Sequence, residues 1–137
     1  MGAPERYEQL LAFLGSQLPE PVDQQPTGDG IEFSAGDPTE VVVRLTRSSV
    51  VVSEFAGFWE TPYRFVPRPR RVGVLKWRRL RETALFNVLG ALIKGAREAR
   101  RARFQVCQYC GRDTAPEWLH DAGVCQTCAN QHSGAIH

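Results

Sequence analysis

The chain has 137 residues, which is enough for one hydrophobic core and a small additional unit. Its hydrophobic content of 42% and charged content of 23% are typical of a folded protein and exclude an intrinsically disordered chain. The longest apolar stretch, residues 84–93, is too short to cross a bilayer, and the N-terminus lacks the basic and apolar regions of a secretory signal. Because four cysteines occur without such a signal, we expect a reducing, cytoplasmic environment and no membrane partner.

The net charge of +2 conceals three blocks of different sign. Residues 1–63 carry three basic and ten acidic side chains, whereas residues 64–103 carry thirteen basic and two acidic ones. Residues 104–137 carry one basic and three acidic side chains. A block as polarised as residues 64–103 indicates more about binding partners than the total charge does.

The first half of the chain predicts one helix followed by strands. Pro4 suits a first helical position, and apolar residues at helical spacing predict an amphipathic helix over residues 4–18. Residues 19–30 contain three prolines and two glycines and predict a loop. Strands are predicted at residues 30–33, 40–46, 50–58, 61–67 and 68–77, the second and third of them joined as a hairpin.

From Trp77 to Arg103 the apolar residues recur at steps of three and four. They predict the buried face of a long helix, formed by Leu80, Leu85, Val88, Leu89, Leu92, Ile93 and Ala96. Gly90 and Gly95 each weaken a helix by roughly 1 kcal/mol relative to alanine, so we expect close packing at these positions. The fold class is therefore α+β, with a small antiparallel sheet of four or five strands flanked by an N-terminal helix and a long C-terminal helix.

All four cysteines lie in the last block, with the spacing C-x2-C-x14-C-x2-C. Each C-x-x-C turn lets two thiolates reach one ion, and Gly111 permits the backbone conformation that such a turn needs. Four sulfurs complete a tetrahedral zinc shell without an open position, and a unit of about thirty residues needs the ion in order to fold. We therefore predict a domain over residues 1–103 that ends in the basic helix, followed by a four-cysteine zinc finger over residues 104–137. Structural Zn²⁺ is predicted to be held by Cys107, Cys110, Cys125 and Cys128.

Other uses of the cysteines fit less well. A thioredoxin-like redox pair needs a C-x-x-C at a helix start within a βαβ pattern, which the sequence does not show. An iron–sulfur cluster also uses four cysteines, but two regular knuckles favour zinc, and catalytic zinc usually has three protein ligands and an open position. His120, His132 and His137 are alternative ligands, which we interpret as surface residues because four cysteines already complete the shell.

The residues around the cysteines resemble a known type of finger. The pattern C-x-Y-C-G, the intervening Pro-Glu-x-Leu and the final C-Q-x-C-A are similar to a treble-clef zinc finger, and loosely to the fingers of DksA/TraR proteins and of the ClpX unfoldase. The resemblance covers about residues 104–134 and implies a structural zinc site that associates with nucleic acid, RNA polymerase or a partner protein. The rest of the chain has neither the coiled-coil hairpin of DksA nor an ATPase. A plain zinc ribbon is the alternative.

The same stretch also resembles HNH nucleases, in which a treble clef carries a catalytic histidine beside an aspartate. Those enzymes need a longer insertion between the cysteine pairs than the fourteen residues found here, and His120 precedes Asp121 instead of following it. The sequence also offers no paired carboxylates, no nucleophile–base set and no phosphate-binding glycine loop. We therefore expect no enzyme and assign no catalytic residues.

The basic residues of the middle block form two clusters. The second, at residues 94–103, lies at the C-terminal end of the predicted helix, where the dipole favours positive charge. The first lies at or before the helix start, where the helix dipole disfavours positive charge. A partner other than the helix would have to stabilise these cations, and a phosphate backbone is one candidate. We predict that this first cluster binds nucleic acid; it consists of Arg68, Arg70, Arg71, Lys76, Arg78, Arg79 and Arg81.

Two other partners for the basic block stay open. It could bind the acidic half of a second copy, which would give a homodimer, or pack on the acidic half of its own chain. Tyr63, Phe65 and Trp77 could stack on bases, although aromatic residues at such positions are more often part of the core. The preferred function is a small zinc-binding protein that binds DNA or RNA or acts in transcription. The alternative is a protein-interaction adaptor or dimerisation module that uses the finger and the helix.

Overall fold

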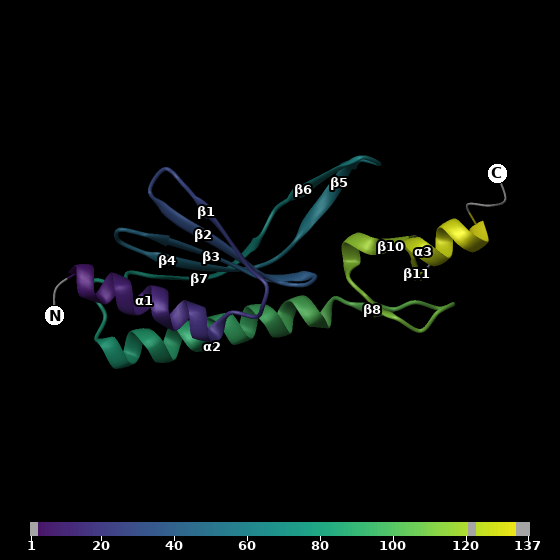
Figure 1. The fold of residues 1–137 in the computed structure, drawn as a ribbon. Coiled ribbons are helices and arrows are strands. Elements are labelled where there is room, and N and C mark those ends of the chain that lie inside the picture. The colour runs from purple at the N-terminus through teal and green to yellow at the C-terminus, as the bar shows by residue number, and fades with distance from the viewer. Residues whose placement is uncertain (1–2, 121–122, 134–137) are drawn as a thin grey trace.

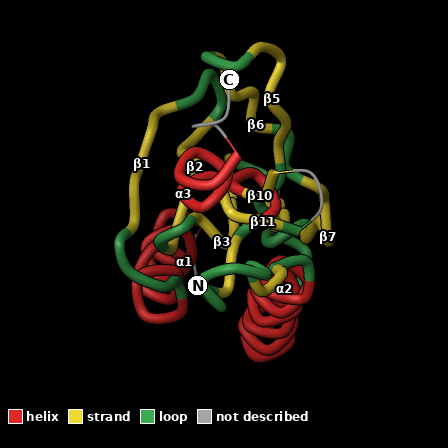
Figure 2. The backbone as a smooth tube through the Cα atoms, turned by 90° about the vertical axis from the view of Figure 1, so that its right-hand side faces the viewer, coloured by secondary structure: helices red, strands yellow, loops and turns green. Residues whose placement is uncertain are grey.

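The computed structural model describes residues 3–120 and 123–133 of the chain. Helix α1 (Ala3–Gln17) precedes a set of strands and helix α2 (Glu82–Ala102) follows them. Both helices lie on the same side of an antiparallel sheet (Figures 1 and 2). The predicted combination of a small antiparallel sheet with helices before and after it is confirmed. Neither helix is long and apolar enough to cross a membrane in the part of the chain that is described.

The main sheet has five strands in the order β1-β2-β3-β4-β7. The strands are β1 (Val22–Pro26), β2 (Gly30–Gly36), β3 (Thr39–Thr46), β4 (Val50–Glu54) and β7 (Arg70–Leu75). Between β4 and β7 the chain forms a separate hairpin, β5 (Gly57–Thr61) and β6 (Arg64–Pro67), which projects from the sheet (Figure 1).

Strand β1 corrects the prediction of a loop over residues 19–30. All five of its residues are exposed, and its polar sequence VDQQP lacks the alternation of apolar and polar residues that signals a strand. The strand forms through antiparallel backbone pairing with β2 at the edge of the sheet. Sequence patterns report side-chain burial, so they miss a strand that is held by its backbone alone.

The hydrophobic core lies between the sheet and the two helices. Alternate residues of β3 and β4 are fully buried, among them Val41, Val43 and Val52, and they belong to one cluster with Leu14 of α1 and Leu89 of α2. Burying a side chain of this size contributes about 1.5–3 kcal/mol, so this inward row decides which face of the sheet the helices cover.

The predicted long helix needs three corrections. Helix α2 begins at Glu82, after the turn that contains Trp77. Val88 is 42% exposed and does not belong to the buried face. The expected close packing at Gly95 is wrong, because a Cβ atom there would have no described atom within 4 Å. Close packing occurs instead at Gly73 of β7, where a Cβ would lie 2.8 Å from a methyl group of Leu92.

Trp77 is a core residue that fixes the segment before α2. It is 1% exposed, and its Nε1 donates a hydrogen bond to the carbonyl oxygen of Thr46 at 2.9 Å. Arg6 of α1 donates to the carbonyl oxygens of Trp77 and Leu80, so the start of α1 is tied to the same segment. The core interpretation therefore applies to Trp77, which is not available to stack on bases.

After α2 the chain forms two short hairpins and a helical end, which we call the cysteine unit (residues 104–120 and 123–133). Its elements are β8 (Gln105–Val106), β9 (Asp113–Thr114), the 3-10 turn η1 (Pro116–Trp118), β10 (Leu119–His120), β11 (Val124–Cys125), α3 (Gln126–Cys128) and η2 (Ala129–Ser133). Strand β8 pairs with β9, and β10 pairs with β11.

Candidate metal centre and basic surface

Four cysteine sulfurs converge inside the cysteine unit. The Sγ atoms of Cys107, Cys110, Cys125 and Cys128 all lie within 4.8 Å of one another, and those of Cys110 and Cys125 are 3.8 Å apart. Sulfurs bound at 2.3 Å to a tetrahedral zinc ion are separated by about 3.8 Å, so the spacing is compatible with one metal ion held by four thiolates.

Two kinds of local structure bring the cysteines together. The first pair lies in the turn of the β8–β9 hairpin, where the N–H of Gly111 donates to the carbonyl oxygen of Cys107 and Gly111 adopts a φ of +73°. A residue with a Cβ atom would be strained in that conformation, which accounts for the glycine. In the second pair, Cys125 ends β11 and is the N-cap of α3, and its sulfur accepts the N–H of Cys128, the last residue of α3.

Backbone N–H groups point at the sulfur of Cys107. This atom accepts hydrogen bonds from the N–H groups of Tyr109 at 3.4 Å and Cys125 at 3.3 Å. Backbone hydrogen bonds, that of Cys110 foremost, lower the pKa of Cys107 to about 6, whereas burial and the neighbouring thiols raise the pKa of Cys128 to about 12. A divalent cation would deprotonate both thiols, because coordination stabilises the thiolate.

The surroundings of the cluster agree with a structural metal site. Cys107, Cys125 and Cys128 are buried with Val124 and Ala129, and Cys110 is exposed. His120 is exposed in β10 and does not belong to the metal-type cluster found among the described residues. The side chain of His132, and the whole of Asp121 and His137, lie outside the described residues.

The C-terminal end of α2 is held by ion pairs that we call the arginine clasp. Its carboxylates are Glu40, Glu54 and Glu117, all with side chains less than a tenth exposed. Glu40 pairs with Arg97 and Arg101. Glu54 pairs with Arg70 and Arg103, and Glu117 pairs with Arg100. Burial alone would raise the pKa of Glu40, but hydrogen bonds from Arg101 and Arg97 outweigh it, so this pKa is below its ordinary value.

Arg100 connects α2 to both the sheet and the cysteine unit. Its side chain is 2% exposed, and its Nη1 donates to Oε1 of Glu117 at 2.8 Å while Nη2 donates to Oε2. Its Nε donates to the carbonyl oxygen of Thr39 at 2.9 Å. The guanidinium carbon lies 5.0 Å from the ring centre of Phe55 and 5.1 Å from that of Phe104. The buried charge is therefore paired, hydrogen-bonded and stacked.

The β5–β6 hairpin is attached to the cysteine unit through Trp59. The Nε1 of Trp59 donates to the carbonyl oxygen of Glu117 at 2.8 Å. The Trp59 ring packs edge-on against Trp118 at 5.8 Å and against Phe65 at 5.3 Å, and Phe65 stacks on Phe55. Glu117 is therefore the point at which α2, the hairpin and the cysteine unit meet.

The arginine clasp explains the second predicted basic cluster. Arg97, Arg101 and Arg103 pair with two carboxylates of the acidic N-terminal half, so the intramolecular alternative applies to them. In the part of the chain that is described, Lys94 pairs with Glu98 alone, and both side chains are exposed. Spacing along the helix could not reveal these contacts, because the partners lie 49–61 residues away in the sequence.

The seven residues predicted to bind nucleic acid follow one another along an edge of the sheet. Arg70 and Arg71 lie in the edge strand β7, Arg68 precedes it, and Lys76, Arg78, Arg79 and Arg81 lie between β7 and α2. All seven are exposed. Only Arg70 forms an ion pair with a described residue, so six of these cations have no carboxylate partner in the described part of the chain.

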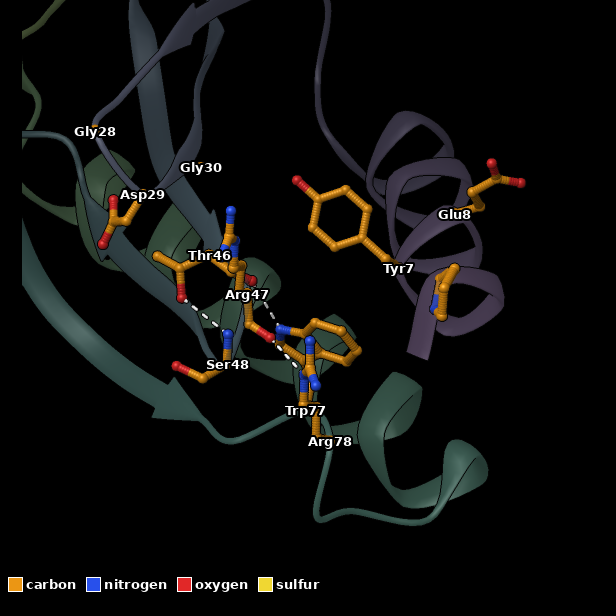
Figure 3. A pocket seen from close by; sticks show the side chains of 11 residues that line it. Tyr7, Glu8, Gly28, Asp29, Gly30, Thr46, Arg47, Ser48, Trp77 and Arg78 are labelled. Atoms are coloured by element: carbon orange, nitrogen blue, oxygen red, sulfur yellow. Dashed lines mark hydrogen bonds between the residues drawn. The ribbon is translucent and has the colours of Figure 1, made fainter. Parts of the chain in front are cut away.

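A cleft of about 990 Å³ opens beside this segment, between α1 and the turns at one end of the sheet (Figure 3). Tyr7 of α1 and Arg47 of the β3–β4 turn line it together with Arg78, whose Nε donates to the carbonyl oxygen of Arg47 at 2.7 Å. Glu8 and Asp29 also line the cleft, which therefore has mixed charge. The fold adds Arg47 to the basic surface; the sequence did not reveal this because Arg47 lies in the acidic half.

These observations define a protein of mixed helix and antiparallel sheet with a C-terminal cluster of four cysteines that is compatible with a bound metal ion. Comparisons of the chain with protein-family models, curated proteins and solved structures give no match. The resemblance of the cysteine unit to treble-clef fingers therefore depends on its own residues.

Proposed function

We propose that this is a zinc-binding protein that binds the phosphates of nucleic acid along the edge of its sheet. We call this surface the basic edge; it comprises Arg47, Arg68, Arg71, Lys76, Arg78, Arg79 and Arg81. The observation that carries the proposal is that the two basic clusters differ in their ion pairs. The clasp neutralises most of the second with buried carboxylates, whereas the basic edge has no ion pair with any described residue.

The shape of the basic edge supports a linear polyanion as the ligand. Strand β7 has six residues and extends over about 20 Å, and phosphates along one nucleic-acid strand repeat at about 3.4 Å. This length equals the axial rise of about six stacked nucleotides, and, within the described chain, Arg71 is the unpaired cation that the strand itself carries. At its far end, Arg81 is the N-cap of α2 and its side chain makes no capping hydrogen bond, so the first N–H groups of the helix also favour an anion there.

Zinc has a structural role in this proposal. Cys107, Cys110, Cys125 and Cys128 would hold Zn²⁺ in a closed shell, so that the ion supplies folding energy and no chemistry. The order of elements supports the treble-clef interpretation over a zinc ribbon: a hairpin turn with one cysteine pair, a second hairpin, and a helix start with the other pair. The folded unit then presents Glu117 to Arg100.

The test is a binding titration of the zinc-loaded full chain with DNA and RNA over a salt series. The variant with Arg71, Lys76 and Arg79 all changed to Glu is compared with a matched control in which Arg44, Lys94 and Arg112, exposed residues outside the proposed binding surface, are changed to Glu. Each replaced phosphate contact should reduce the slope of log affinity against log salt by about one. We expect a large loss in the first variant and a small one in the control. Absence of binding by the wild type at low salt would overturn the proposal.

A protein-interaction function is the second candidate. It is favoured by three exposed apolar side chains on the cysteine unit, Val106, Tyr109 and Trp118. Aromatic residues are enriched at protein interfaces, and such a surface would suit a partner protein or a second copy. Sedimentation of the zinc-loaded protein over a concentration series tests the homodimer, which a monomer at all concentrations would exclude.

A further inference from the structure

The β5–β6 hairpin has two faces with different environments. Phe58 pairs with Val66 and Trp59 pairs with Phe65 across the hairpin, so Phe58 and Val66 share one face while Trp59 and Phe65 share the other. The Trp59 face is occupied, because Trp59 donates to the carbonyl oxygen of Glu117 and packs on Trp118. This contact anchors the hairpin; its tip stays exposed, and Phe58 on the opposite face is 40% exposed, as is Trp59 itself.

The exposed side of the hairpin carries two aromatic rings. Tyr63 at the tip is 95% exposed, although its backbone N–H is fixed by a hydrogen bond to Oγ1 of Thr61 at 3.2 Å. Phe58 on the open face is 40% exposed. A ring that remains in water contributes little to the hydrophobic stability of the fold. The anchored hairpin therefore holds one ring that lies almost wholly in water, Tyr63, and a second, Phe58, that is partly accessible.

An arginine lies over one of these rings, and another arginine follows the second ring in the chain. The guanidinium carbon of Arg68 lies 5.1 Å from the ring centre of Phe58. Arg68 belongs to the basic edge and lies between the hairpin and β7. Arg64 follows Tyr63 in the chain and is exposed, and among the described residues its one ion pair is a long contact of 3.8 Å to Glu60. Aromatic rings next to cations are the combination that binds single strands, because the bases stack while the cations contact the backbone.

We propose that the β5–β6 hairpin is a base-stacking arm that continues the basic edge, and that the ligand is therefore a single-stranded nucleic acid. This inference rests on the proposed function. In a duplex the faces of the bases are covered by their neighbours, so only an unpaired strand offers them to Phe58 and Tyr63. The anchor through Trp59 holds the arm in place before binding, which reduces the ordering cost of association.

The experiment measures the affinity of the zinc-loaded full chain for a short single strand, for its duplex, and for an abasic strand with the same phosphates. The variants Y63A and F58A should each weaken binding of the base-containing strand about fivefold or more. Their salt dependence should equal that of the wild type, because no phosphate contact is lost. Y63F retains the ring and should bind like the wild type. A far-UV spectrum checks folding, which a side chain as exposed as Tyr63 should not affect.

Different results separate this inference from the proposed function. Equal affinity of Y63A and F58A with the wild type, or equal wild-type affinity for the abasic strand, would overturn the arm and leave the basic edge standing. Tighter binding of the duplex than of the single strand would also overturn the arm. Failure of the wild type to bind any nucleic acid at low salt would overturn both.

Discussion

The Arg100–Glu117 ion pair allows a quantitative test of how the cysteine unit is attached. The variant E117Q keeps the size of the side chain but leaves the buried Arg100 guanidinium without a counter-charge. Breaking a buried pair by removing one partner costs about 3–5 kcal/mol, and single domains unfold with a free energy of about 5–15 kcal/mol. The amide oxygen of Gln retains one hydrogen-bond acceptor, so we expect a loss of about 3 kcal/mol.

Urea unfolding of the zinc-loaded protein, followed by circular dichroism, measures this loss as a lower midpoint with an unchanged slope. E98Q is the matched control, because Glu98 forms an exposed pair with Lys94 at 3.9 Å and its replacement should change the stability by less than about 0.5 kcal/mol. Adding R100M to E117Q should recover part of the loss, since removing both charges is far less costly than removing one. A loss below about 1 kcal/mol in E117Q, or additive effects in the double variant, would refute the argument.

Three further predictions concern the clasp, the sheet and the metal. The pKa of Glu40 is lowered on folding, so its pairing contributes stability that is fully present above about pH 4.5 and is lost as the pH falls further. In acid unfolding experiments, the stability of E40Q should therefore depend less on pH in that window than the stability of the wild type does. A Cβ atom on Gly30 would clash with the backbone oxygen of Leu45, so thermal unfolding should show that G30A is destabilised by about 1–3 kcal/mol. The control G15A in α1 should not be destabilised, because no described atom lies within 4 Å of the added Cβ. Chelation should release one zinc ion and expose four thiols per chain, as measured with a thiol reagent. The far-UV signal of the sheet and the long helices should persist, because their core is separate from that of the cysteine unit; loss of that signal would show that the sheet domain and the cysteine unit fold together.

The features predicted from sequence are those that a local pattern encodes. The stripe containing Leu85, Leu89 and Ile93 recurs at helical spacing and is buried against the sheet as expected. The two C-x-x-C motifs predict a four-sulfur site because the motif itself supplies the geometry of each pair, and the four sulfurs do converge. In both cases the information lies within a few residues of chain.

The features that sequence reasoning missed depend on contacts between distant residues. Arg100 and Arg71 look alike in the sequence, yet Arg100 is buried between two aromatic rings while Arg71 is exposed on an edge strand. Only the folded sheet decides which arginine meets a buried carboxylate. The same applies to Trp59, whose anchor, Glu117, lies 58 residues away.

The position of the cysteine unit next to the basic helix has a physical explanation in Glu117. This residue lies between the two cysteine pairs, so its position depends on the fold that a bound ion would impose on the unit. Its carboxylate holds Arg100 at the end of α2, and its backbone oxygen holds Trp59 of the β5–β6 hairpin. The cysteine cluster and the proposed stacking arm are thus connected through one residue. The effect of zinc on binding would therefore be exerted on the arm and on Arg68 beside it, while the other cations of the basic edge, which lie on β7 and in the turns at the far end of the sheet, would keep their positions.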